Sequence, residues 1–318
     1  MDFGLHLGTR GPVAQADNIR ALAEHADRLG LTYLGFSDHV VIGRDIASRY
    51  PYSESGDWPG ASSGFCLEQL VCLAYAAAVT QHIRLLTSVM VLPHRPAILT
   101  AKMLATADLL SKGRLTVGVG VGWMEEEMRA LGSPPYDARG AASNEYIEVI
   151  RTLWTEAAPN YQGKFVAVAD VLFEPKPLQK PNPPIWVGGE GAAARRRAGR
   201  LGDGWYPTIR NPRFPLDTPA AFASALGDVR RHAEAAGRDP TAVDVALFAP
   251  GCRLGTPHMG RDGKRMSFTG SAQEIAADAR AYKERGVKHL VIGIEANALP
   301  EYLDRVEGFL SEVVPLVG

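Results

Sequence analysis

The stretch that decides the fold is Gly118-Val119-Gly120-Val121-Gly122-Trp123-Met124-Glu125-Glu126-Glu127, taken with the apolar run Arg84–Val91 that precedes it. Its apolar residues are interrupted only by Thr87 and Ser88, as expected of a parallel strand covered on both faces. Pro96 then begins a helical pattern that Gly113 ends, and a second apolar strand runs from Arg114 into the glycines. The stretch is therefore a βαβ unit whose second strand ends without side chains, where a ligand can approach the backbone closely.

The spacing of these glycines does not match the dinucleotide-binding fingerprint. Counting from Gly118 puts the third required glycine at Trp123, and counting from Gly120 puts it at Glu125. Two interpretations stay open. Gly120 and Gly122 contact a cofactor directly, or the glycines only relieve crowding between barrel strands.

Strand and helix patterns alternate along the whole chain of 318 residues. Eight strands are expected, at Phe3–Gly8, Tyr33–Ser37, Arg84–Val91, Arg114–Val119, Ile185–Gly189, Gly204–Pro207, Val243–Phe248 and His289–Ile294. The helical patterns between them are Ala14–Leu29, Leu67–Thr80, Ala97–Ser111, Asn144–Trp154, Ala192–Leu201, Pro219–Ala236 and Ala272–Arg285, with a last helix from Pro300. Eight such units predict an α/β protein with a single (β/α)₈ TIM-barrel domain over residues 1–318, and an open doubly wound sheet is the alternative.

Three segments are too long for simple connections. Val41–Gly64 and Gly251–Phe268 follow strands, so we expect both at the C-terminal face, where barrel enzymes bind their substrates. Pro159–Pro184 contains an alternating stretch at Gly163–Val168 and predicts a hairpin insertion beside the barrel.

The formal net charge is −1, so no overall field attracts nucleic acid or an anionic membrane. The longest apolar run, Leu70–Val79, is about half of the roughly 20 residues that a membrane span needs. The three cysteines show no metal-type spacing and fit reduced thiols, and no signal-peptide pattern is visible. We therefore expect a cytoplasmic protein whose partner is a small-molecule substrate.

Candidate chemistry gathers at the predicted strand ends. Asp38 and His39 follow the second strand, where an imidazole could exchange a proton near neutral pH, although an Asp-His pair can equally be structural. The run Pro184–Ala194 delivers glycines to a helix N-terminus, a typical phosphate site, and a plain βα turn is the alternative. The sequence contains no HxH or HExxH motif, so no metal site is predicted. Nucleophile-elbow and Walker motifs are also absent from the sequence, which favours chemistry carried by a bound cofactor.

These motifs together resemble the bacterial luciferase-like superfamily of flavin- or deazaflavin-dependent (β/α)₈ oxidoreductases. The matching stretches are Ser37-Asp38-His39, Ser88-Val89, Gly118–Glu127, Pro184–Gly191, Leu201–Trp205 and Thr269-Gly270-Ser271. Within the superfamily, the first two look like the branch that uses the deazaflavin coenzyme F420. In that branch the third strand carries a bulge with a non-prolyl cis peptide behind the deazaflavin ring, which the resemblance places at Ser88-Val89.

The resemblance implies a role for each matching residue. Asp38 and His39 would be catalytic, with His39 exchanging the proton that accompanies hydride transfer. Glu126 falls where relatives often carry Asn, so its role on the ribityl chain is open. The full implied cofactor-binding set is Asp38, Ser88, Val89, Met90, Gly120, Gly122, Glu126, Gly188, Gly189, Glu190 and Gly191.

Three functions are compatible with this resemblance. The first is an F420-dependent oxidoreductase that moves a hydride between the deazaflavin and an organic substrate. The second is an FMN-dependent monooxygenase that uses O₂ and receives reduced flavin from a partner reductase. The third is a barrel that binds flavin without turnover. The resemblance also implies a homodimer.

Overall fold

Eight parallel strands close into a barrel in the computed structural model, which describes residues 1–318 except 12, 59, 61–62 and 261–262. Around the barrel the order is β1-β12-β9-β8-β7-β4-β3-β2. Their bounds are β1 Asp2–Leu7, β2 Tyr33–Phe36, β3 Arg84–Val91, β4 Leu115–Gly120, β7 Ile185–Gly188, β8 Gly204–Tyr206, β9 Asp244–Ala249 and β12 His289–Gly293. All eight coincide with predicted strands to within a few residues, so the predicted TIM barrel is confirmed and the open sheet is wrong.

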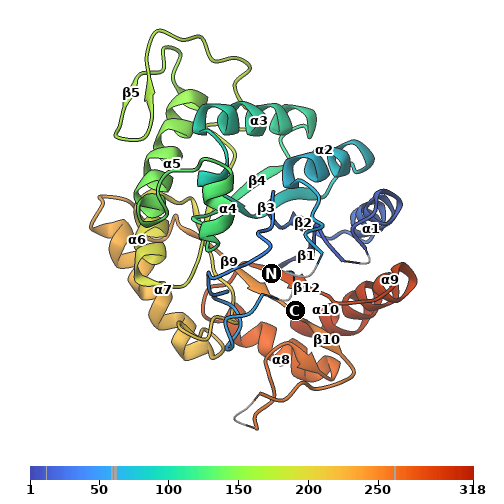
Figure 1. Ribbon diagram of the computed structural model, residues 1–318. Coiled ribbons are helices and arrows are strands. Elements are labelled where there is room, and N and C mark those ends of the chain that lie inside the picture. The colour runs from blue at the N-terminus through green and yellow to red at the C-terminus, as the bar shows by residue number, and fades with distance from the viewer. Residues whose placement is uncertain (12, 59, 61–62, 261–262) are drawn as a thin grey trace.

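Helices form the outer layer of the barrel (Figure 1). They are α1 Ala16–Arg28, α2 Gln69–Val79, α3 Ala97–Leu110, α4 Glu125–Ala130, α5 Arg139–Thr155, α6 Ala192–Leu201, α7 Pro219–Glu234, α8 Ala272–Lys283, α9 Leu299–Gly308 and α10 Val314–Val317. Single turns of 3₁₀ helix lie at Leu92–His94 and Tyr136–Ala138, and a π-helical turn lies at Phe309–Val313. Thr218 caps α7, and Ser271 with Glu274 forms a reciprocal capping box on α8.

One prediction for the helices needs correction. The α5 helix begins at Arg139 rather than at Asn144, because Ala138 precedes it and offers no side-chain cap from which the start could be recognised. None of the helices that the structure describes is long and apolar enough to cross a membrane.

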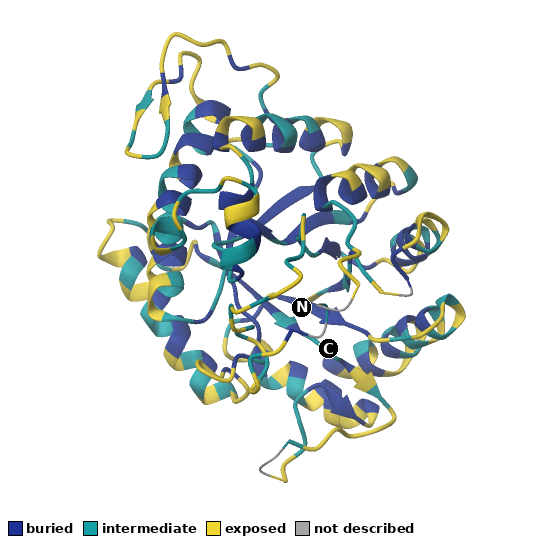
Figure 2. Ribbon diagram, viewed as in Figure 1, coloured by how far each residue is buried: buried dark blue, intermediate teal, exposed yellow. Residues whose placement is uncertain are grey.

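Buried apolar side chains form two clusters, and Figure 2 shows that the barrel strands are largely buried whereas the outer helices mix buried and exposed residues. The larger lies between the strands and the helices, and its members include Leu34, Leu85 and Ile185. A smaller one inside the barrel is formed by Tyr33, Leu86, Trp186, Tyr206, Ala246 and Val291. Bulky side chains thus close the interior, as in other TIM barrels, and leave the carboxyl ends of the strands for a site.

The insertion after α5 is a small antiparallel hairpin of β5 (Tyr161–Gln162) and β6 (Ala167–Val168). The hairpin is confirmed, but the predicted strand at Gly163–Val168 is mostly the turn, because the pairing begins at Tyr161. The segment after β9 contains β10 (Arg253–Leu254), which pairs in parallel with β11 (Thr269–Gly270). The sequence did not suggest that small sheet.

Candidate functional site

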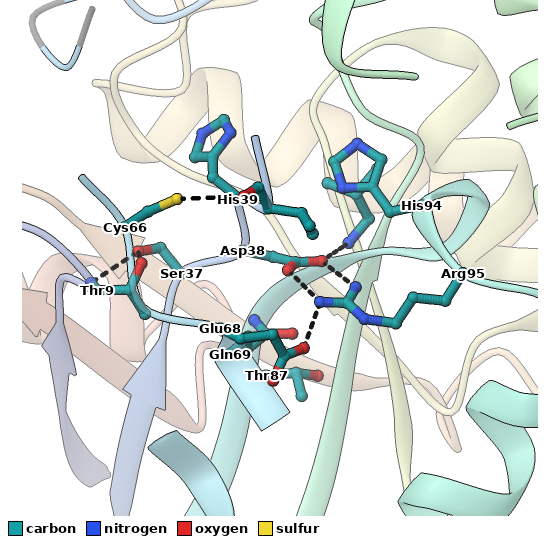
Figure 3. Close-up of polar contacts among 12 residues, drawn as sticks. Thr9, Ser37, Asp38, His39, Cys66, Glu68, Gln69, Thr87, His94 and Arg95 are labelled. Atoms are coloured by element: carbon teal, nitrogen blue, oxygen red, sulfur yellow. Dashed lines mark hydrogen bonds and ion pairs between the residues drawn. The ribbon is translucent and has the colours of Figure 1, made fainter. Parts of the chain in front are cut away.

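Asp38 closes the end of β2 from inside a polar cluster (Figure 3). Arg95 donates to its two carboxylate oxygens over 2.8 and 2.9 Å, and the backbone N–H of Val91 donates over 2.8 Å. Arg95 also contacts Glu68 at 2.6 Å, and this acidic surrounding raises the pKa of Arg95 against the opposing effect of burial. Because three hydrogen bonds hold the carboxylate, Asp38 fixes the end of β3 through Val91, which is the structural alternative that the sequence left open for this residue.

His39 is held by a buried glutamate from α4. Its Nδ1 lies 2.8 Å from Oε2 of Glu127, whose side chain is 1% exposed. The other carboxylate oxygen accepts from the backbone N–H groups of Val40 and Val41 at 2.6 and 3.2 Å. An ionised carboxylate only accepts hydrogen bonds, so Nδ1 carries the proton and Nε2 keeps a free lone pair. The pair is the arrangement of an oriented acid–base group.

Aromatic rings surround this imidazole. The Trp58 ring is 4.5 Å from that of His39, and Trp123 is 6.3 Å away in an edge-on arrangement. Tyr50 packs against Trp123 at 5.1 Å between ring centroids. Residues of the 41–64 segment therefore lie over the strand ends, as expected of a loop at the C-terminal face.

The Ser88-Val89 junction is the irregular point of β3. Its peptide bond is cis, and the register with β4 shifts between Thr87 and Met90, so both parts of the prediction are confirmed. The Val89 methyl groups occupy space that a Cβ at Gly120 or Gly188 would need, at 2.8 and 3.1 Å. The crowding interpretation thus holds for Gly120, and Gly188 on β7 also makes room for Val89.

The walls next to this junction come from other strands. Ser88 Oγ lies 2.9 Å from the hydroxyl of Tyr206 on β8. His6 on β1 packs against Phe248 with the ring centroids 4.8 Å apart and the rings tilted, and burial lowers its pKa to about 4, opposed by a contact with the backbone of Ser88. His6 is therefore neutral near pH 7. The side chain of Met90 is buried in the outer core, so only its backbone faces the junction.

Glu126 anchors the 41–64 loop. Its Oε1 accepts from the backbone N–H groups of Ala47 and Ser48 at 2.8 and 3.1 Å, and these bonds contribute to lowering its pKa against the effect of burial. The Oε2 atom is buried with no hydrogen-bond partner among the described residues. Glu126 thus has one oxygen committed to the loop and one available.

The turn after β7 presents backbone rather than side chains. Gly189 has φ of +103°, and α6 begins after Gly191 with no side-chain cap, which leaves its first N–H groups unpaired by side chains. Glu190 turns away from this turn. Its oxygens accept from the Thr208 N–H at 2.8 Å and from the Asn211 amide at 2.6 Å, while burial raises its pKa. The arrangement fits an anion at the helix N-terminus, with Glu190 bracing the turn.

The comparisons with known proteins agree with this architecture. A family model described as luciferase-like monooxygenase matches residues 1–253. The chain belongs to the luciferase-like monooxygenase family. An uncharacterized protein of Mycobacterium tuberculosis is 34% identical over 288 residues, which cover 90% of this chain and 97% of that protein.

Named relatives of this luciferase-like chain differ in cofactor. The FMNH₂-dependent dimethylsulfone monooxygenase of Pseudomonas putida is 36% identical over 174 residues, which cover 54% of this chain and 45% of that enzyme. The coenzyme F420-dependent tetrahydromethanopterin reductase of Methanopyrus kandleri aligns over 100% of this chain and 99% of its own, with a TM-score of 0.75 and 18% identity. The second likeness shows a shared fold alone. The chain is thus a luciferase-like oxidoreductase.

Sequence reasoning missed two residues of this luciferase-like site. They are Glu127, which had no predicted role beyond ending the Gly118–Glu127 stretch, and Arg95, which had none. The role of Glu127 becomes visible only once the chain is folded, because its partner His39 lies 88 positions earlier in the sequence. Asp38, His39 and the Ser88-Val89 junction do come together at one end of the barrel, as predicted.

Proposed function

We propose that this protein is an F420-dependent oxidoreductase that transfers a hydride between the deazaflavin and an organic substrate. The observation that carries the proposal is the His39–Glu127 pair at the strand ends. Hydride transfer to or from a carbonyl or alcohol needs a separate proton acceptor or donor for the oxygen. His39 offers Nε2 for that proton, while Glu127 holds the ring in one orientation.

The residues around the junction fit a flat ring with a phosphate. Val89, wedged between Gly120 and Gly188, gives an apolar backing, and the uncapped start of α6 after Gly191 offers N–H groups to an anion. When bound, the cofactor supplies the redox chemistry and the protein supplies orientation and the proton. Gly122 lies on the connection from β4 to α4 and Glu126 in the first turn of α4, where they would meet the polar chain between ring and phosphate.

A second function has its own support. The P. putida relative is named as FMNH₂-dependent, which favours an FMN monooxygenase that uses O₂ and a partner reductase. The two functions differ in which cofactor the apoprotein binds. A third function, a barrel that binds flavin without turnover, would bind one of these cofactors in the titration but show no redox turnover of it.

Titration of the apoprotein with F420, FMN and FAD, followed by fluorescence, separates these functions. Trp58 and Trp123 lie beside His39 and report binding at the mouth. We expect F420 to bind at least tenfold more tightly than FMN, a difference of about 1.4 kcal/mol. Saturation by FMN with no binding of F420 would contradict the proposal and support the monooxygenase.

We also propose that the protein is a homodimer. Helices α2 and α3, which contact each other, expose apolar side chains along their lengths, of which Val71 and Leu110 are 68% and 67% exposed and Ile98 and Leu99 are also exposed. Such a patch on a soluble protein typically marks an interface. Light scattering after size exclusion should give twice the 34.2 kDa chain mass. Leu110→Glu should shift the protein to the monomer. A wild-type protein that is itself a monomer would overturn this proposal.

A further inference from the structure

A groove between α5 and α6 lies outside the site described above. It holds a cavity of about 340 Å³ whose lining includes Gly140, Asn144 and Ala193 together with three arginines of α6. The two helices lie side by side on the outside of the barrel (Figure 1). The groove is thus a separate concave surface with a strongly basic wall.

Arg197 is the unusual member of this wall. The residue is only 8% exposed, yet its guanidinium donates hydrogen bonds to two neutral acceptors, Asn144 Oδ1 at 2.6 Å and the Gly140 carbonyl at 2.9 Å. Burial, together with the neighbouring charges of Arg196 and Arg139, lowers the pKa of Arg197 to about 10. Buried cations are normally paired with an anion. Across the described part of the chain, no carboxylate comes within 4.0 Å of this guanidinium.

The other arginines of the groove also lack a carboxylate partner among the described residues. Arg196 and Arg200 are exposed and make no ion pair with any described residue, in contrast to Arg195 on the same helix, which contacts Asp228 at 2.9 Å. Glu148 also lines the groove, but its Oε2 accepts from the Tyr161 hydroxyl at 2.8 Å. Three cations therefore face one carboxylate.

The direction of the groove relates it to the barrel mouth. Gly140 and Ala193 lie in the first turns of α5 and α6, and α6 begins directly after the β7 turn at the carboxyl end of the barrel. From Ala193 to Leu201 the helix rises about 12 Å, at 1.5 Å per residue. A ligand that leaves the mouth beside the turn at 188–191 would meet the arginines in succession.

We propose that the groove between α5 and α6 binds the carboxylates or phosphates of an extended anionic ligand that leaves the barrel mouth. The inference rests on the proposed function, since F420 carries a lactyl and oligoglutamate chain beyond its phosphate whereas FMN ends there. The arginines would then hold the carboxylates of that chain. The groove would add affinity for the tail without touching the reacting ring.

The test compares F420 carrying several glutamates with the same cofactor lacking them. The variant is Arg196→Ala combined with Arg200→Ala, and both side chains are exposed, so the fold should survive. Its matched control is Arg230→Ala with Arg285→Ala, which removes two charges elsewhere on the surface. We expect the wild type and the control to prefer the tailed form by about threefold to tenfold at low ionic strength, and the groove variant to lose that preference. Salt should weaken the preference.

Equal affinity for both forms in the wild type, or a preference that persists in the groove variant, would overturn the inference. If the wild type binds neither form, the proposed function fails, and the groove is tested alone with tri-γ-glutamate and with inorganic phosphate in thermal shift. Stabilisation by tri-γ-glutamate in the wild type but not in the groove variant would still support the groove. Stabilisation by inorganic phosphate alone, or by neither, would overturn it.

Discussion

Replacing Glu127 tests how much the site depends on one buried carboxylate. Its oxygens accept from His39 Nδ1 and from the N–H groups of Val40 and Val41. In Glu127→Gln one oxygen can still accept from the backbone, but the amide NH₂ then faces Nδ1. The proton of His39 would have to move to Nε2, which blocks that atom as a base.

The contacts give the size of the effect. Exchanging charged for neutral hydrogen bonds costs about 1 kcal/mol each, so Glu127→Gln should lose about 1–3 kcal/mol of stability. Glu127→Ala leaves two backbone N–H groups without their acceptor and should lose about 3–5 kcal/mol. Turnover in the Gln variant should fall by about 10²-fold or more, because proton transfer by a positioned group is worth about 10²–10⁴-fold.

Urea denaturation followed by tryptophan fluorescence measures the loss of stability, and steady-state kinetics measures the loss of turnover. The control is Glu125→Gln on the same helical turn, whose carboxylate is 46% exposed and pairs only with exposed Arg129, so less than about 0.5 kcal/mol should be lost. If Glu127→Ala unfolded within about 1 kcal/mol of the wild type, or Glu127→Gln turned over normally, the assigned role of Glu127 would be refuted.

Three other changes have defined outcomes. His39→Ala should keep cofactor but lose about 10²–10⁴-fold in turnover, and loss of cofactor with unchanged turnover per bound cofactor would make His39 structural. Val89→Phe should weaken cofactor binding about tenfold in fluorescence titration, because Gly120 and Gly188 already admit only the valine methyls, and unchanged affinity would count against this backing. The pKa of His6 is lowered to about 4 in the folded protein, so between pH 6.5 and 4 the unfolded chain binds more protons than the folded one. The free energy of unfolding should therefore fall by on the order of 3 kcal/mol as the pH is lowered from 6.5 to 4. His6→Asn should flatten that part of the urea-midpoint profile, and an equally steep profile would refute it.

The fold was predictable because its signals are local. Apolar strands, helix caps such as Thr218 and Ser271, and terminating glycines each act within a few residues, and eight repeated units leave few closed arrangements. The start of α5 was missed for the same reason, since Ala138 carries no local start signal. The chain order of strands then brings Asp38 and the Ser88-Val89 junction to one end.

The partners within the site were not predictable in this way. Asp38 binds Arg95, 57 positions later, and Glu190 turns toward Thr208 rather than toward the βα turn. Such pairs depend on the direction of individual side chains after the barrel closes. Residue type and spacing located the site but did not distinguish a residue that would contact the cofactor from one that positions its neighbours.

The short helix α4 divides the loop above it into two mechanical parts. Glu127 and Glu126 bind backbone N–H groups at 40–41 and 47–48, and Ser48 Oγ accepts from the Glu125 N–H. Beyond that point Tyr50 and Trp58 contact Trp123 through ring packing, and such aromatic pairs are worth only about 0.5–1.5 kcal/mol each. A ligand that enters from above can therefore displace the aromatic part of the loop at low energetic cost, while the part that is hydrogen-bonded to α4 stays fixed. Exchange of ligand need not disturb the hydrogen bond between His39 and Glu127.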